Sequence, residues 1–174
     1  MKRALFFFGL SVLAACGSPT PSGMDGGFDA GGPAMPSMFT AAGSLTGTIT
    51  APKPTVGYDA TGDEGSFLLK KSVAGLPFKA DVTIEFTGAP AAMTYTSSSP
   101  GFSCNVLVTS GTAAADTWVA LFNSPAGANK GTCSLTFTSA MNSATGYTVA
   151  GSLSITADNS GGAATGMVTL TGSF

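Results

Sequence analysis

The sequence predicts an all-β fold: an antiparallel β-sandwich of about eight or nine strands with one disulfide, or alternatively a small up-and-down β-barrel. Three observations support this prediction. Apolar and polar residues alternate with period two from residue 43 onward, turn-forming residues separate these stretches, and no convincing helical period appears.

The clearest predicted strand is KADVTIEFTG, residues 79–88. Side chains alternate between the two faces of a strand, whereas a helix would scatter the same positions around its axis. One face of this strand is apolar and the other is polar. The apolar face carries Ala80, Val82, Ile84 and Phe86, and the polar face carries Asp81, Thr83, Glu85 and Thr87.

The same alternation predicts further strands along the chain. They span 43–51, 66–74, 93–97, 103–110, 117–123, 132–139, 147–157 and 166–174. Connections rich in Gly, Pro, Asn and Ser lie between them, as in SSPG (98–101) and NSGGAATG (159–166). Alternation of this kind is typical of a sheet with one packed face and one wet face.

The first 15 residues have the pattern of an export signal. Lys2 and Arg3 give a positive start, and an apolar run of about ten residues follows, too short for the ~20 residues that a membrane-spanning helix needs. Two small residues, Ala14 and Ala15, close the segment before a cysteine. We therefore expect residues 1–15 to be a signal peptide.

The four residues Leu13-Ala14-Ala15-Cys16 resemble the lipobox of bacterial lipoproteins. The resemblance implies that the Cys16 sulfur receives a diacylglyceryl group, that the chain is cut before Cys16, and that the new amino terminus gains another acyl chain. Two or three acyl chains anchor a protein stably, whereas one chain holds only marginally. By the same resemblance, Gly17 rather than Asp after the cysteine favours the outer membrane.

Residues 16–40 are predicted to be a flexible tether, because Gly, Pro, Ser and Ala dominate and no apolar period appears. Its r.m.s. reach would be about 25–30 Å. We expect residues 41–174 to form one folded domain.

Two cysteines remain once Cys16 takes lipid, and only one pairing is open to them. Cys104 and Cys133 both lie on the apolar faces of predicted strands. An exported chain meets oxidising conditions, so we expect this pair to form a disulfide.

The charge balance argues against nucleic acid as a partner. Beyond the signal the chain has five lysines, no arginine and nine acids, whereas nucleic acid is bound mainly through Lys and Arg. The composition also gives no basic patch for anionic headgroups.

The sequence offers little chemistry for catalysis. It has no histidine, which excludes Ser-His-Asp and Cys-His catalysis and His-ligated metals. Acids gather only in YDATGDEG, where Asp59, Asp63 and Glu64 form a weak candidate for Ca²⁺. A solvated turn is the alternative, since the EF-hand pattern fails there. We therefore expect no enzyme, no cofactor apart from this calcium candidate, and no other metal.

Aromatic residues leave two interpretations open. Trp118 is a candidate ligand contact but fits a core or rim position better. Six phenylalanines, which serve equally well as core, could instead line a barrel cavity: Phe67, Phe78, Phe86, Phe102, Phe122 and Phe137.

These observations predict a membrane-anchored envelope lipoprotein with a non-catalytic structural or binding role. Its partner would be an envelope protein or a polysaccharide. The first alternative is a carrier of lipophilic small ligands with a β-barrel cavity. The second is a carboxylate-based or Ca²⁺-dependent carbohydrate-active protein.

Overall fold

The computed structural model describes residues 37–51, 53–71, 75–111, 116–125, 127–144, 146–163 and 165–174. The chain divides into two units, Met1–Pro33 and Ala34–Phe174. All described residues belong to the second unit, the β unit, and the following description concerns it alone.

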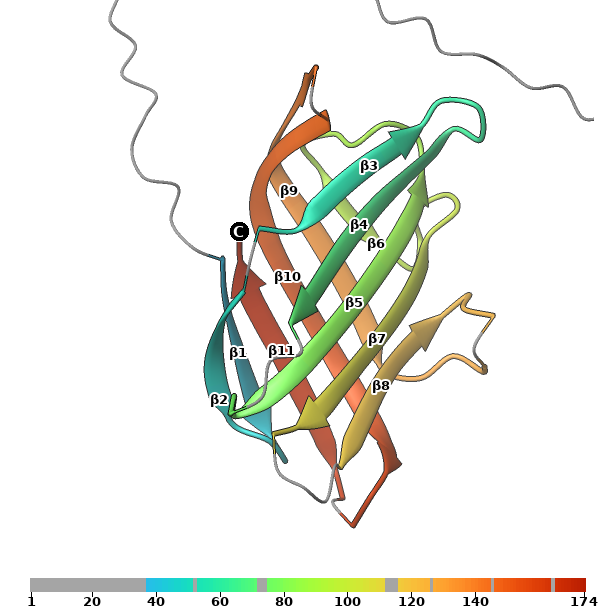
Figure 1. The fold of residues 1–174 in the computed structure, drawn as a ribbon. Coiled ribbons are helices and arrows are strands. Elements are labelled where there is room, and N and C mark those ends of the chain that lie inside the picture. The colour runs from blue at the N-terminus through green and yellow to red at the C-terminus, as the bar shows by residue number, and fades with distance from the viewer. Residues whose placement is uncertain are drawn as a thin grey trace, which may run out of the picture. The chain divides into compact units, whose positions relative to one another are not determined.

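The β unit consists of antiparallel strands joined by turns and loops (Figure 1). Its strands are β1 (Ser37–Gly43), β2 (Gly47–Ala51), β3 (Thr55–Asp59), β4 (Glu64–Lys71), β5 (Phe78–Thr87), β6 (Thr94–Thr96), β7 (Ser103–Ser110), β8 (Thr117–Phe122), β9 (Thr132–Ser143), β10 (Gly146–Gly161) and β11 (Met167–Ser173). The residues in the ranges above contain no helix, and no membrane-crossing helix is found among them.

A single sheet links all the strands and forks at β10. Its main path runs β2-β1-β11-β10-β8-β7-β5-β4-β3. One edge of β10 pairs with β9 over residues 146–156 and with β8 over residues 158–161. β9 in turn pairs with β6. The sheet therefore has two arms beyond β10, a long arm β8-β7-β5-β4-β3 and a short arm β9-β6.

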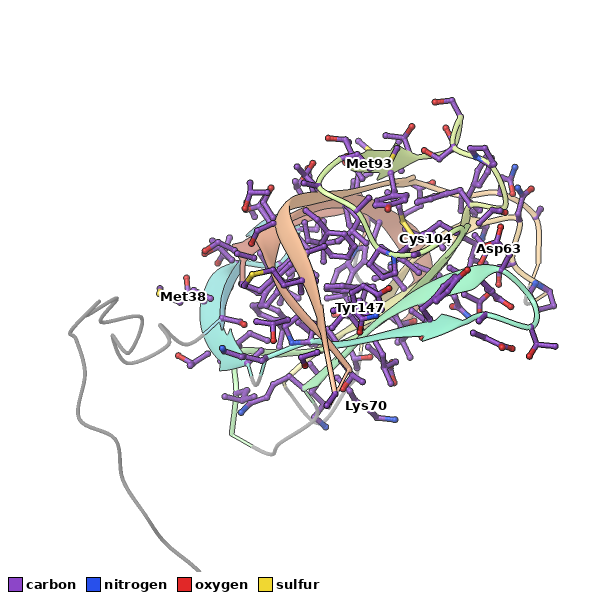
Figure 2. All side chains as sticks on the ribbon, turned by 90° about the horizontal axis from the view of Figure 1, so that it is seen from above. Met38, Asp63, Lys70, Met93, Cys104 and Tyr147 are labelled. Carbon is purple, nitrogen blue, oxygen red and sulfur yellow. A yellow bond between two sulfur atoms is a disulfide. The ribbon has the colours of Figure 1, made fainter. Side chains whose placement is uncertain are left out.

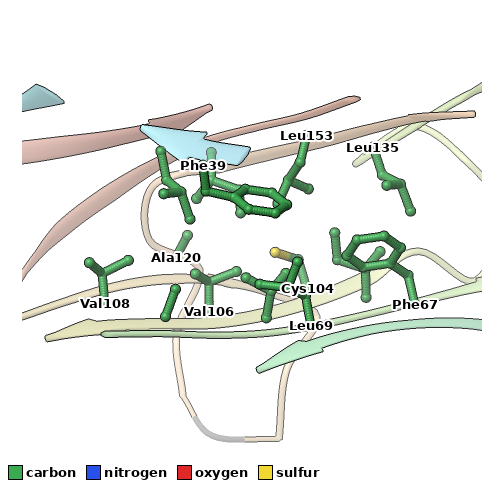
Figure 3. Close-up of a cluster of buried hydrophobic side chains, with 14 of the residues drawn as sticks. Phe39, Phe67, Leu69, Cys104, Val106, Val108, Ala120, Leu135 and Leu153 are labelled. Atoms are coloured by element: carbon green, nitrogen blue, oxygen red, sulfur yellow. The ribbon is translucent and has the colours of Figure 1, made fainter. Parts of the chain in front are cut away.

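The sheet curls so that the long arm faces β1, β11, β10 and β9 (Figure 1). The apolar core fills the space between these two layers. In Figure 3, Phe39, Leu135 and Leu153 meet side chains of β4 and β7 from the opposite layer. This arrangement confirms the predicted all-β antiparallel fold with one disulfide.

Strand β5 shows how the sequence alternation sets the burial. Its predicted inward residues are almost completely buried, and the intervening residues are partly exposed. β5 lies between β4 and β7, with Ile84 opposite both Phe67 and Cys104. The central strand thus presents an apolar row to the core on one side and a polar row to solvent on the other.

Two strands were not expected from the sequence. β1 begins at Ser37, so its residues Ser37–Thr40 fall within the range 16–40 that the sequence predicted as tether. Its only large inward residue is Phe39, because the other inward positions hold Ser37 and Ala41. The alternation was therefore not visible in the sequence. β3 buries only Val56, which is too little for a visible alternation.

Candidate functional site

The disulfide Cys104–Cys133 lies where the two arms of the sheet separate. Cys104 is on β7 in the long arm, and Cys133 is on β9 in the short arm; their Cα atoms are 6.5 Å apart. Both cysteines belong to the core or pack against it. The predicted pairing is therefore confirmed, and it joins two strands that are not hydrogen-bonded neighbours.

A pocket of about 360 Å³ opens beside this disulfide. We call it the fork pocket. Its lining combines Cys133 and the rings of Phe102 and Phe122 with smaller and polar residues. These are Ser97, Asn129, Lys130, Gly131, Thr132 and Asp158. The two rings, Phe102 and Phe122, contact each other with centroids 6.0 Å apart. Ligand pockets in proteins have volumes of ~300–1,000 Å³ with a mainly apolar lining and few polar groups, so this one lies at the small and polar end.

Loop 123–131 holds the polar rim of the fork pocket. The backbones of Leu121 and Lys130 exchange two hydrogen bonds of 2.8 Å, which bring the loop back along β8. The Asp158 carboxylate accepts a hydrogen bond of 3.0 Å from the Gly131 backbone N–H. The Asn123 side chain donates to the Phe102 carbonyl oxygen at 3.1 Å. The rim thus contains one basic residue, Lys130, and one acidic residue, Asp158, in the same pocket as the two rings.

The acidic candidate residues lie at the turn of the β3–β4 hairpin. The Asp59 carboxylate accepts a hydrogen bond of 2.8 Å from the Thr61 N–H, which is the usual Asx-turn arrangement. The Tyr58 hydroxyl donates to Asp63 at 2.7 Å. This hydrogen bond, with smaller contributions from burial and nearby negative charge, raises the pKa of Tyr58 above 10.0.

Asp59, Asp63 and Glu64 do not form a metal-binding cluster in the structure. No group of three or more carboxylate, thiol or imidazole side chains suited to a metal ion occurs in the described ranges. Two of the three acids already act as hydrogen-bond acceptors within the hairpin. The calcium site stays a prediction from the sequence.

Trp118 lies inside the core, only 1% exposed, and does not line the fork pocket. Its indole Nε1–H finds no hydrogen-bond acceptor among the described residues. Trp118 opposes Val108 on β7 and Asn159 on β10, so it packs where the long arm leaves β10. The structure places it in the core rather than at the rim.

Of the six phenylalanines considered as cavity lining, all but Phe122 are almost fully buried, and Phe122 packs against the core. All but Phe78 contact other rings directly. Phe137 lies 6.3 Å from Phe67 and 6.1 Å from Phe86, measured between ring centroids. These rings therefore fill the space between the layers, as the core interpretation predicted.

A feature that the sequence reasoning missed lies on the long arm, over β4, β5 and β7. Lys70, Lys71 and Lys79 line one shallow groove of about 390 Å³ together with Asp81 and Leu107. The pairing of β4 with β5 places Lys70 opposite Asp81 and Lys71 opposite Ala80. In the sequence, the pair Lys70-Lys71 and the third lysine, Lys79, stand on either side of one hairpin turn. Only the pairing register of β4 and β5 shows that they come together.

The predicted lipidation site Cys16 lies outside the described residues. No family model matches the chain, and neither a curated protein nor a solved structure matches it. The structure itself defines the class of protein as a disulfide-linked β unit with a forked, curled sheet.

Proposed function

We propose that this chain is an exported, lipid-anchored envelope protein whose β unit has a structural or binding role and no catalytic step. The observation that carries the proposal is the sequence Leu13-Ala14-Ala15-Cys16 after a short apolar run and a positive start. In this proposal Cys16 carries the lipid and residues after it connect the anchor to the β unit.

The buried disulfide supports export by a separate argument. Disulfides persist in oxidising compartments and are rare in the cytosol of mesophiles. Cys104 and Cys133 come from strands in different arms, so the bond links parts of the sheet that backbone pairing leaves apart. Such a link is useful in a protein that leaves the cell interior.

The absence of histidine from the sequence supports a role without catalysis, because the commonest general base is missing. The partner class we propose is a protein or polysaccharide of the envelope. For a polysaccharide, aromatic rings exposed side by side would be the usual platform. Among the described aromatic residues only Tyr58 is exposed, at 36%, so the described part of the chain has no exposed pair of rings.

Cell fractionation tests the anchor. The full chain and its Cys16→Ser variant would be expressed in a bacterium and separated into soluble and membrane fractions. We expect the unaltered chain in the membrane fraction, released by detergent but not by high salt, and the variant in the soluble fraction. Ser22→Ala is the matched control and should stay with the membrane. A Cys16→Ser chain that remains membrane-bound would contradict the proposal.

The fork pocket favours a second candidate function, the binding of a small, partly apolar ligand. It combines two adjacent rings with an ammonium and a carboxylate group in about 360 Å³. The probe is 1-anilinonaphthalene-8-sulfonate, whose fluorescence rises in apolar surroundings. Thr132→Trp would place a ring in the pocket and should abolish binding. Thr171→Trp, at an exposed position of β11, should leave binding unchanged. Equal binding by both variants would rule out this candidate.

A further inference from the structure

We propose that the groove around Lys70, Lys71 and Lys79 is a docking face for the phosphate groups of anionic lipids. The proposal rests on the proposed function, since a lipid anchor would keep the β unit close to such a surface. It differs from the expectation from composition, because three of the five lysines in the described residues line one groove.

The charge distribution is the first argument. The described residues contain five lysines and seven carboxylates. Three lysines and only Asp81 line the groove, which gives this face a net charge of about +2. The other two lysines stand against six carboxylates, a net charge of about −4. Positive charge in the described residues is therefore concentrated at this groove.

The partners of these lysines give the second argument. Lys70 forms an ion pair of 3.1 Å with Asp81, and both side chains are well exposed. Within the described ranges no carboxylate lies within ion-pair distance of Lys71 or Lys79. The Lys79 ammonium thus keeps its charge available for a ligand on the outer face, where Asp81 fixes Lys70 beside it. Lys71 pairs with the buried Ala80 and lines the groove from the end of β4.

The surroundings of the lysines suit a lipid surface. Leu107 lies opposite Asp81 in the β5–β7 pairing, lines the same groove and is 43% exposed. Figure 2 shows Lys70 projecting from the sheet on the side away from the core. Ammonium groups beside an exposed apolar side chain match a headgroup region, where phosphates lie next to acyl chains.

The anchor explains how so small a patch could act. Each lysine near an anionic membrane strengthens binding about fivefold, so two or three lysines alone bind weakly. Attachment through Cys16 would raise the local concentration of the membrane to about the millimolar range. Weak attraction then suffices to turn this face of the long arm toward the bilayer.

Vesicle sedimentation at low salt tests the patch apart from the anchor. The protein used is residues 16–174 with Cys16→Ser, which lacks the predicted signal peptide. Vesicles would contain phosphatidylglycerol and phosphatidylcholine in equal parts, or phosphatidylcholine alone. The test variant is Lys79→Gln. The control is Lys53→Gln, which changes the net charge equally at a position outside both the groove and the fork pocket.

We expect binding to the anionic vesicles only, about fivefold weaker for the test variant and within about twofold of the parent for the control. Equal losses in both variants would show that net charge alone acts and would overturn the proposal. So would equal binding to both vesicle types. Competition by inorganic phosphate beyond that of chloride at matched ionic strength would indicate a free-phosphate site instead. None of these outcomes depends on lipidation of Cys16.

Discussion

Gly172 on β11 is a residue whose lack of a side chain is required by packing. It pairs with Phe39 on β1 and with Leu153 on β10. A Cβ atom at this position would overlap the Phe39 ring, and it would lie 2.6 Å from the Met38 carbonyl oxygen. The Phe39 ring therefore covers the glycine, an arrangement by which an aromatic side chain compensates for Gly in a strand.

We predict that Gly172→Ala destabilises the β unit by about 1–3 kcal/mol, because the fully buried ring must move to admit the methyl group. Urea unfolding followed by tryptophan fluorescence measures the change. Gly57→Ala is the control, since its Cβ would meet only the Ser66 side-chain oxygen at 3.0 Å, and that side chain can rotate. Equal stability of the two variants would contradict this packing argument.

The Tyr58–Asp63 hydrogen bond predicts a pH dependence in the alkaline range. The pKa of Tyr58 is raised above 10.0 in the folded state, mainly by this bond. A raised pKa means that the bond stabilises the fold fully below the unfolded pKa of 10.0. That stabilisation is lost as pH rises through the folded pKa, because the phenolate no longer donates a proton.

Ultraviolet titration of phenolate absorbance, taken as the difference between the parent and Tyr58→Phe, isolates this residue. We expect its midpoint above 10.0, and a lower midpoint in Asp63→Asn. An unchanged midpoint in Asp63→Asn would show that the carboxylate does not hold the proton on Tyr58.

At the scale of elements, the disulfide joins the two arms of the sheet beyond the fork at β10. β8 and β9 share one edge of β10, and among the described strands no strand of one arm pairs with a strand of the other. Cys104–Cys133 links them across 29 positions of sequence. A covalent loop of this size lowers the entropy of the unfolded chain.

We therefore predict that replacing both cysteines, Cys104→Ala/Cys133→Ala, lowers the free energy of unfolding by ~3–4 kcal/mol. Thermal unfolding followed by circular dichroism measures this loss. Reduction of the parent by dithiothreitol is the matched comparison and should have a similar effect. If reduced and oxidised protein unfolded at the same temperature, the two arms would not depend on this bond.

Strong alternation made most strands predictable. The expected 103–110 coincides with β7 (Ser103–Ser110) and the expected 79–88 lies within one residue of β5 (Phe78–Thr87). β1 and β3 escaped because each has few large inward side chains. The fork was also beyond the sequence, since which strand pairs with which edge of β10 depends on tertiary packing rather than on local periodicity.

Candidate sites were predictable only where one residue type carries the chemistry. Two cysteines on apolar faces were enough to predict the disulfide. The fork pocket escaped because its lining comes from the β6–β7 region, the end of β8, loop 123–131, the start of β9 and β10, segments that only the folded chain brings together. The lysine groove escaped for the same reason, since composition counts charges without placing them.

At the scale of the whole molecule, the proposed function requires two covalent features in one mature chain, a lipidated Cys16 and the Cys104–Cys133 bond. Both follow from export, and each changes the mass of the protein by a defined amount. Their presence together would support the account of an anchored, disulfide-linked β unit.

The intact mass of the protein purified from bacterial membranes tests this account most directly. The account predicts a chain that begins at Cys16, carries two or three acyl chains and is lighter by two hydrogen atoms, which reappear after reduction. A chain with an unmodified Cys16, or one that shows no mass change on reduction, would contradict it.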